Sequence, residues 1–295
     1  MQNIELWYDP AQKATELMPA VENEPEMSSN ESAFLCGLIK HYKPKKILEV
    51  GIAAGATTGI IIEAAGQLNY GHIDMYSVDL SISYYRDNNK CKRQSGFMAD
   101  YIISKYSSTI SHRFFLGKYL PEVLNDIGDG IDFLVLDTVH AMPGEFLDYI
   151  SVLPFLKDGA IVVLHDTEYH LYHQTVPSCG FSNNLLYGMM CGDKIMQFDQ
   201  SRPFLLPNIT AMVITPDSKK YINNVFWGLS YKWEYIISSK EFDIYRNWYN
   251  RFYDKDSIQV FESSFAANCS LSRKPLFQKI VSGLYLFGKM ILRGL

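Results

Sequence analysis

One stretch near the start of the chain constrains the fold more than any other, because it combines a strand, a glycine turn and a helix start. It runs from Lys45 to Thr58 and reads KKILEVGIAAGATT. The apolar run that ends at Val50 is typical of a short buried strand, and Gly51 interrupts it. An apolar helix is expected around 59–65. A strand, a tight loop and a helix N-terminus together direct backbone N–H groups at a ligand.

A second strand indicates that this ligand is a nucleoside. Residues 75–78 form an apolar and aromatic run that ends in Asp79. A carboxylate at the tip of the second strand can accept hydrogen bonds from both ribose hydroxyls. Two simpler alternatives stay open: the glycine loop can be a turn without a ligand, and Asp79 can be a helix N-cap.

Apolar runs alternate with helical segments along most of the chain. The run at 131–136 is almost continuously apolar, as a central parallel strand is, and further strands are expected at 112–116 and 160–164. This alternation predicts an α/β fold with a doubly wound, mostly parallel sheet of Rossmann type. Runs at 195–198 and 211–214 are expected to complete seven strands as an antiparallel pair.

These elements divide the chain into three parts. Residues 1–44 are expected to form an N-terminal arm and a capping helix, which begins at a serine-to-glutamate capping box at Ser28. Residues 45–216 hold the sheet, and 217–295 form a helical extension. A long loop at 168–193 is expected to act as a lid over the acceptor.

Ligands of such sheets bind beyond the carboxyl ends of the strands. Imidazole groups at that edge can take protons near neutral pH, and carboxylates can hold a hard divalent cation. The side chains expected at this edge are Glu49, Asp79, Asp137, His140, His165 and Asp166.

Two motifs resemble those of a known superfamily. The E-x-G-x-A-x-G loop that begins at Glu49 is similar to motif I of class I S-adenosylmethionine-dependent methyltransferases, usually E-x-G-x-G-x-G. The pattern Leu-Asp-x-x-His after the fourth strand, then a helix, Leu-x-x-Gly, a strand and His-Asp, resembles the macrocin-type sugar O-methyltransferases. It is more distantly similar to catechol O-methyltransferase. The resemblance covers 28–216 and is most specific between the fourth and fifth strands.

This resemblance implies a cofactor, S-adenosyl-L-methionine (SAM), and a small-molecule acceptor that carries a hydroxyl group, such as a sugar. His140 would be the general base, and Asp137 would lie between the cofactor and a Mg²⁺ ion that Asp166 also binds. Of the implied cofactor contacts, Gly117 is assigned only by its position after the third strand. The full set is Glu49, Gly51, Ala53, Gly55, Thr57, Asp79, Gly117 and Asp137.

The chain departs from this branch after the fifth strand. The usual pair there is Asp-Asp or Asp-Asn, whereas this chain has Asp166-Thr167. Because threonine is a poorer ligand for a hard cation, three outcomes stay open: a weak metal site, a site that recruits Glu168, or no metal. Asp137 and Asp166 can also be helix caps or turn formers, and His140 can be a hydrogen-bonded loop residue.

Composition disfavours several other classes of protein. The net charge of −5 argues against a nucleic-acid partner, which usually requires a basic face. The 5 cysteines are widely spaced without a C-x-x-C pair, which indicates a reducing compartment. No signal peptide and no long uninterrupted apolar stretch are evident, so a cytoplasmic protein is expected.

The last segment of the chain has a character of its own. Residues 275–295 contain lysine and arginine but no acidic residue, and their polar side chains fall on one narrow arc of a helical wheel. Such a basic amphipathic helix can lie peripherally on an anionic membrane surface. It can equally pack in a homo-oligomer or against its own domain.

Two other functional classes stay open. The first is a nucleotide-sugar or NAD-dependent enzyme on a similar sheet, although the spacing of the glycine loop argues against it. The second is a binding or scaffold protein that keeps the methyltransferase fold without the chemistry.

Overall fold

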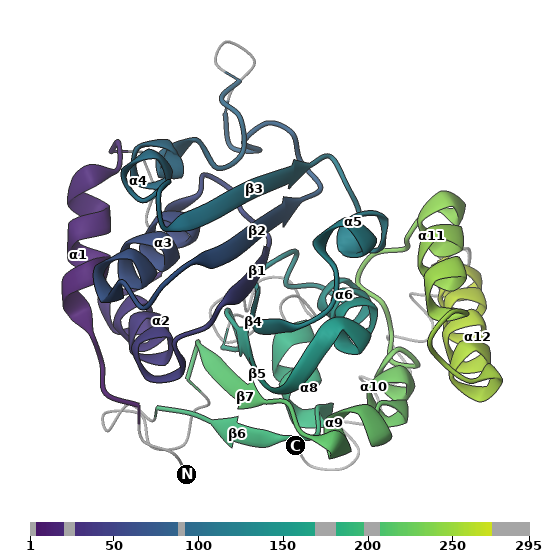
Figure 1. The fold of residues 1–295 in the computed structure, drawn as a ribbon. Coiled ribbons are helices and arrows are strands. Elements are labelled where there is room, and N and C mark those ends of the chain that lie inside the picture. The colour runs from purple at the N-terminus through teal and green to yellow at the C-terminus, as the bar shows by residue number, and fades with distance from the viewer. Residues whose placement is uncertain (1–3, 21–26, 88–91, 169–180, 198–206, 273–295) are drawn as a thin grey trace, which may run out of the picture.

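A central sheet of seven strands in the order β3-β2-β1-β4-β5-β7-β6 organises the chain (Figure 1). The strands β1 to β5 run parallel, and β7 is antiparallel to both β5 and β6. The predicted doubly wound, mostly parallel α/β sheet is therefore confirmed. The computed structural model describes residues 4–20, 27–87, 92–168, 181–197 and 207–272.

The strands differ from their predicted bounds mainly beyond β4. Strand β5 begins at Leu156 rather than at residue 160, because Leu156 pairs with Ile131 and a register shift absorbs the Asp158-Gly159 turn within the strand. Strand β6 overlaps the predicted run at 195–198 only at Ile195, because it begins two residues earlier, at Asp193. The strands are β1 (Lys46–Val50), β2 (Ile73–Asp79), β3 (Ile110–Leu116), β4 (Ile131–Leu136), β5 (Leu156–Leu164), β6 (Asp193–Ile195) and β7 (Thr210–Val213).

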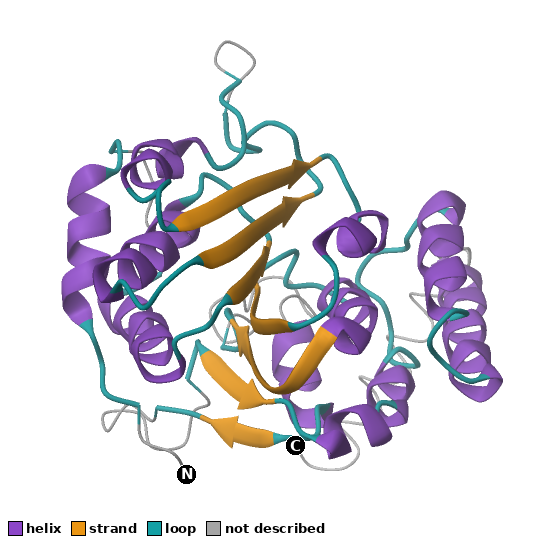
Figure 2. Cartoon of the chain, in the orientation of Figure 1, coloured by secondary structure: helices purple, strands orange, loops and turns teal. Residues whose placement is uncertain are grey.

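Helices cover both faces of this sheet (Figure 2). The first face carries α1 (Tyr8–Leu17), α2 (Ser29–Tyr42), α3 (Ala56–Leu68), η1 (Phe97–Ala99) and α4 (Asp100–Lys105). The second face carries α5 (Leu120–Ile127), α6 (Gly144–Val152), η2 (Leu153–Phe155) and α8 (Ser182–Met189).

The central strand β4 shows why both faces need cover. Its side chains alternate, so Phe133 and Val135 enter the core under α2 and α3, whereas Leu134 and Leu136 enter the core under α5 and α6. Every residue of β4 is buried. A strand of this kind reads as a continuous apolar run, which is how the sequence predicted it.

The C-terminal extension packs on the α6 side of the sheet. Its described helices are α9 (Pro216–Lys220), α10 (Asn223–Gly228), α11 (Ser239–Tyr249) and α12 (Lys255–Ser272). Three aromatic side chains anchor it to α6: Trp248 donates a hydrogen bond to the carbonyl of Ser151, Tyr249 to that of Leu147 and Tyr253 to that of Ile150.

The extension, predicted as helical, is interrupted between α10 and α11. Helix α10 ends at Gly228, and the following segment takes its hydrogen bonds from distant parts of the chain. The backbone N–H groups of Glu234 and Tyr235 both donate to the carbonyl of Met142, and that of Trp233 donates to the side chain of Asn268. Tertiary partners therefore replace the helical ones here.

Two predicted features fall partly or wholly outside the described residues. The tail at 275–295 lies beyond them, and so do residues 169–180 of the lid predicted at 168–193, whose described remainder contains α8. None of the helices that the structure describes combines the length and the apolar character that a membrane crossing requires.

Candidate active site

The loop between β1 and α3 makes its turn through three residues with positive φ angles. Gly51 has φ 91°, Ala53 has φ 49° and Gly55 has φ 98°. A Cβ atom on Gly51 would lie 1.8 Å from the carbonyl oxygen of Asp137, and one on Gly55 would lie 2.7 Å from the Cα of Gly96. The two glycines are therefore required by close backbone approach, whereas alanine fits at the middle position.

The carboxylate of Asp79 holds this loop against the end of β2. Its Oδ2 accepts hydrogen bonds from the backbone N–H groups of Ile52 and Ala53, at 2.9 and 3.1 Å. Its Oδ1 accepts one from the N–H of Ser81, at 2.7 Å. Asp79 also lines the cavity beside the loop, so the same side chain shapes the loop and faces the space for a ligand.

That cavity has a volume of about 510 Å³ and lies beyond the carboxyl ends of β1, β2 and β4. Of the residues predicted for the cofactor, the metal and the base, ten can be checked against the residues that line this cavity. The lining includes Gly51, Ala53, Thr57, Asp79, Asp137 and His140. It does not include Glu49, Gly55, Gly117 or Asp166, as far as the described residues show.

Glu49, predicted to contact the cofactor, lies beneath the loop and is absent from the cavity lining. Its side chain is fully buried, and its Oε2 accepts hydrogen bonds from the hydroxyls of Thr58 and Ser77, each at 2.7 Å. Burial raises the pKa of Glu49 to about 8, and the hydroxyl donors offset this only in part, while the charges of Asp137 and Asp79 raise it further. Glu49 therefore supports the loop from inside the protein.

Gly117 and Gly55 allow turns of the backbone and are not among the residues that line the cavity. Gly117 has φ 69°, and its N–H donates to the carbonyl of Asp79, so it turns the chain after β3. Gly55 is the N-cap of α3.

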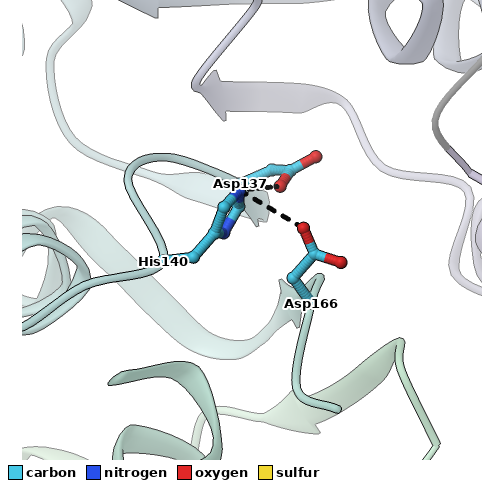
Figure 3. A group of neighbouring side chains, drawn as sticks. All are labelled: Asp137, His140 and Asp166. Atoms are coloured by element: carbon cyan, nitrogen blue, oxygen red, sulfur yellow. Dashed lines mark ion pairs between the residues drawn. The ribbon is translucent and has the colours of Figure 1, made fainter. Parts of the chain in front are cut away.

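The three residues predicted for metal binding and base catalysis do come together (Figure 3). One ligand atom from each of Asp137, His140 and Asp166 lies within 4.8 Å of the others. Nε2 of His140 is 3.2 Å from Oδ2 of Asp166 and 3.7 Å from Oδ1 of Asp137. The imidazole therefore faces two carboxylates that come from the ends of β4 and β5.

A second histidine, His165, lies behind this group and is buried. Its Nδ1 is 3.3 Å from Oδ2 of Asp137, and its Nε2 is 3.8 Å from a carboxylate oxygen of Glu31 on α2. Burial alone would lower the pKa of His165, but the Asp137 carboxylate raises it well above its usual range. The pKa of Glu31 is lowered to about 2, because the hydrogen bond and charge of His165 outweigh burial.

Thr167 and Glu168 do not join the metal-binding group among the described residues. The hydroxyl of Thr167 donates to the carbonyl of Pro207 and so points away from Asp166. The amide of Asn208 donates instead to Oδ1 of Asp166, at 3.1 Å, and to Glu31, at 2.8 Å. Asp166 is thus oriented by a hydrogen bond from the start of β7.

Glu145 is a site residue that the sequence reasoning missed. It is fully buried in the first turn of α6, and its Oε1 accepts hydrogen bonds from the backbone N–H of His140 and the hydroxyl of Thr138. Oε1 also lies 3.8 Å from Nδ1 of His140, whose φ is 54°. The sequence could have indicated Glu145, because it is an acidic residue in the first turn of the helix that follows the loop with Asp137 and His140.

The mostly parallel sheet with its antiparallel edge and the glycine loop after β1 are the features on which the resemblance to class I SAM-dependent methyltransferases was based. Residues 48–167 match the model of a family described as a methyltransferase domain. The comparison therefore supports a methyltransferase domain over this part of the chain. No curated protein matches it.

Several solved structures are similar in fold. The O-methyltransferase TomG from Streptomyces achromogenes, in complex with SAM, is 14% identical over 70% of this chain and 90% of that chain, with a TM-score of 0.45. The S-adenosylhomocysteine (SAH)-bound methyltransferase PaMTH1 from Podospora anserina is 12% identical over 70% and 86%, with a TM-score of 0.44. An O-methyltransferase from Bacillus cereus in complex with SAH is 13% identical over 70% and 91%, with a TM-score of 0.43.

We predict that Glu49 makes the protein less stable as the pH rises, and that Glu49→Gln removes this part of the pH dependence. The folded-state pKa of Glu49 is raised to about 8 from 4.5, so the folded protein keeps a proton that the unfolded chain releases. This contribution to stability is present below the unfolded pKa and falls as the pH rises toward 8. We expect this contribution of Glu49 to lower the free energy of unfolding of the wild type by roughly 3 kcal/mol between pH 5 and pH 7.5, and to be absent from Glu49→Gln.

Urea unfolding of both proteins at the two pH values measures this difference. Glu16→Gln, a change of an exposed glutamate on α1, is the matched control and should leave the pH dependence unchanged. Equal pH dependence in the wild type and Glu49→Gln would contradict the prediction.

Proposed function

We propose that this methyltransferase transfers the methyl group of SAM to a hydroxyl oxygen of a sugar or another small molecule. The observation that carries the proposal is the position of His140, whose imidazole lines the cavity and faces the carboxylates of Asp137 and Asp166. A hydroxyl must lose its proton as it attacks, and a neighbouring imidazole can accept that proton near neutral pH.

The cavity suits the proposed cofactor. Gly51 and Ala53 let the backbone approach a zwitterionic amino-acid group closely, and Thr57 lies beside them at the start of α3. Asp79 already binds loop N–H groups, but each carboxylate oxygen has a second lone pair for a ribose hydroxyl. When bound, SAM supplies an electrophilic methyl group, and the protein's share is to hold both partners in line.

The donor set at Asp137, His140 and Asp166 fits a divalent cation in either of two ways. Carboxylate oxygens suit Mg²⁺, whereas imidazole nitrogen suits transition metals such as Zn²⁺. With Mg²⁺, Asp137 and Asp166 would hold the ion, which lowers the pKa of a bound hydroxyl, and His140 would remain free as the base. A transition metal that took all three ligands would remove the base.

We favour the first arrangement, in which His140 is the base. Glu145 supports it, because its carboxylate lies on the Nδ1 side of the ring while Nε2 faces the site. The segment from the fourth to the fifth strand, which includes Asp137 and His140, is also the part of the chain that most specifically resembles the macrocin-type sugar O-methyltransferases. The sugar acceptor rests on that resemblance.

Binding of SAH tests the cofactor assignment most directly. Isothermal titration should give micromolar affinity for the wild type and at least about 10-fold weaker affinity for Asp79→Ala, because the loop loses its brace and the ribose its acceptor. Asp74→Ala, at the opposite end of β2, should bind SAH normally. Absence of SAH and SAM binding to the wild type would defeat the proposed function.

His140→Ala should lower kcat by about 10² or more and leave the affinity for SAH unchanged, because the base acts on the acceptor. Turnover with acceptors found by screening sugars and catechols measures this effect. The exposed His72 offers the matched control, since His72→Ala should keep full turnover. An unimpaired His140→Ala variant would remove His140 from the mechanism.

The two metal arrangements predict different binding of Mg²⁺ to the SAH-bound enzyme. With His140 as the base, Mg²⁺ should still bind His140→Ala, and Asp166→Ala should lose most of the Mg²⁺ affinity. Calorimetric titration with MgCl₂ gives both values. Loss of Mg²⁺ binding in His140→Ala would show that the imidazole is a ligand, and failure of Mg²⁺ to bind the wild type would show that the site works without it.

A further inference from the structure

One segment of the C-terminal extension, around α10, packs on the domain with one side and faces solvent with the other. Its buried side chains recur at helical spacing and belong to the core on the α6 side of the sheet. They are Ile222, Val225, Phe226 and Leu229. Between Ser218 and Trp233 the chain contains three lysines and no acidic residue, so the solvent side of this segment is basic.

Three aromatic side chains lie on that solvent side. Trp227 is 61% exposed and Tyr231 is 54% exposed, and the N–H of Tyr231 still bonds to the carbonyl of Gly228, so the two rings are neighbours one turn apart. Tyr221 is also exposed, and Nζ of Lys220 lies 4.8 Å from the centre of its ring. We call these three rings the aromatic surface.

The end of α12 is fixed beside the aromatic surface. Helices α10 and α12 pack against each other in the extension (Figure 1). The side chain of Asn268 accepts a hydrogen bond from the N–H of Trp233, at 2.8 Å, and donates one to the carbonyl of Tyr231, at 3.3 Å. Leu271, on the next turn of α12, is exposed. Since α12 ends at Ser272, the chain continues from here into the basic tail.

The sequence beyond Ser272 repeats this chemistry in a stronger form. From Arg273 to Leu295 the chain holds 5 lysine and arginine residues and no acidic residue, although the whole chain has a net charge of −5. The apolar residues of this part are mostly Leu, Ile and Phe. Lys279, Lys289 and Arg293 interrupt them, so no apolar run is long enough to cross a bilayer.

This combination of groups fits the surface of a membrane. Tryptophan and tyrosine are favoured at the boundary between lipid and water, where the ring is in contact with apolar groups and its polar atom stays hydrated. Lysine and arginine without neighbouring acids are attracted to anionic lipid headgroups. Isolated exposed aromatic residues are common, whereas several rings beside an acid-free basic segment indicate an interaction surface.

Charge favours a membrane over a second copy of the chain. A symmetric dimer would place the same surface on both sides of its interface. Lys220 and Lys232 would then face lysines of the other copy, and juxtaposed like charges oppose binding. An anionic lipid surface carries the complementary charge.

We propose that the aromatic surface and the tail at 275–295 together bind membranes that contain anionic lipids. Trp227 and Tyr231 insert at the level of the headgroups, and the lysine and arginine residues contact lipid phosphates. The two parts act together because they lie on one chain, so binding of one raises the effective concentration of the other. The inference does not depend on the proposed function, since the aromatic surface is no part of the cavity lining among the described residues.

Cosedimentation of the full chain with lipid vesicles tests the proposal. Vesicles that mix phosphatidylcholine with phosphatidylglycerol should bind the wild type at least about 10-fold more tightly than vesicles of phosphatidylcholine alone. Added salt should weaken the binding, because it screens the charges of the lipids and the protein.

The aromatic surface is tested by Trp227→Ser combined with Tyr231→Ser, which should weaken binding to the mixed vesicles by about 10-fold or more. Tyr8→Ser combined with Tyr101→Ser is the matched control. Both of these tyrosines are exposed, but they lie on α1 and α4, on the opposite face of the sheet, so the control should bind normally.

The tail is tested by Lys289→Gln combined with Arg293→Gln, which should also weaken binding by about 10-fold or more. The control with the same change of charge is Lys13→Gln combined with Lys43→Gln, at two exposed positions on the α1 and α2 side, and it should bind normally. Thermal unfolding confirms that each variant is folded.

Tryptophan fluorescence gives a second measurement that a change in stability would not imitate. Trp227 is largely exposed, whereas Trp233 and Trp248 are buried. Its emission should shift to shorter wavelength when mixed vesicles are added. Trp227→Phe should keep most of the binding and lose this shift.

The other outcomes would each overturn the proposal. These are failure of the wild type to bind the mixed vesicles, equal binding to both kinds of vesicle, and unchanged binding in either double variant. A wild-type dimer in analytical ultracentrifugation that dissociates on Trp227→Ser combined with Tyr231→Ser would also overturn it, because a second copy would then cover the aromatic surface.

Discussion

The active site depends on one interaction, the hydrogen bonds that the carboxylate of Asp79 accepts from the loop after β1. Backbone N–H groups at Ile52 and Ala53 converge on a single oxygen, which fixes the loop between two parallel strands. Gly51 can then lie against the carbonyl of Asp137 because it has no side chain. The ends of β1, β2 and β4 are thereby held in one geometry, and the cavity forms among them.

On the other side of β4, buried charged side chains are likewise stabilised by the partners that they contact. His165 lies between the carboxylates of Asp137 and Glu31, and the amide of Asn208 binds both Glu31 and Asp166. A buried carboxylate is tolerated only with such partners. The network therefore joins α2, β4, β5 and the start of β7, and it orients the two carboxylates that face His140.

Much of this arrangement followed from local patterns in the sequence. The apolar run of β4 and the capping box at Ser28 each depend on neighbours in the chain, and both are present in the structure. The meeting of Asp137, His140 and Asp166 was predictable because parallel strands end at one edge. The buried position of Glu49 beneath the loop could not be predicted, because tertiary packing decides which side of a strand faces the interior.

The extension shows where local reasoning reaches its limit. Tyr245 and Asp148 are 97 residues apart, and nothing near either one indicates that they share a hydrogen bond. The hydroxyl of Tyr249 binds the carbonyl of Leu147, one residue from Asp148, so α11 is anchored at the cavity wall itself. The extension therefore both stabilises α6 and contributes Tyr245 to the lining of the cavity.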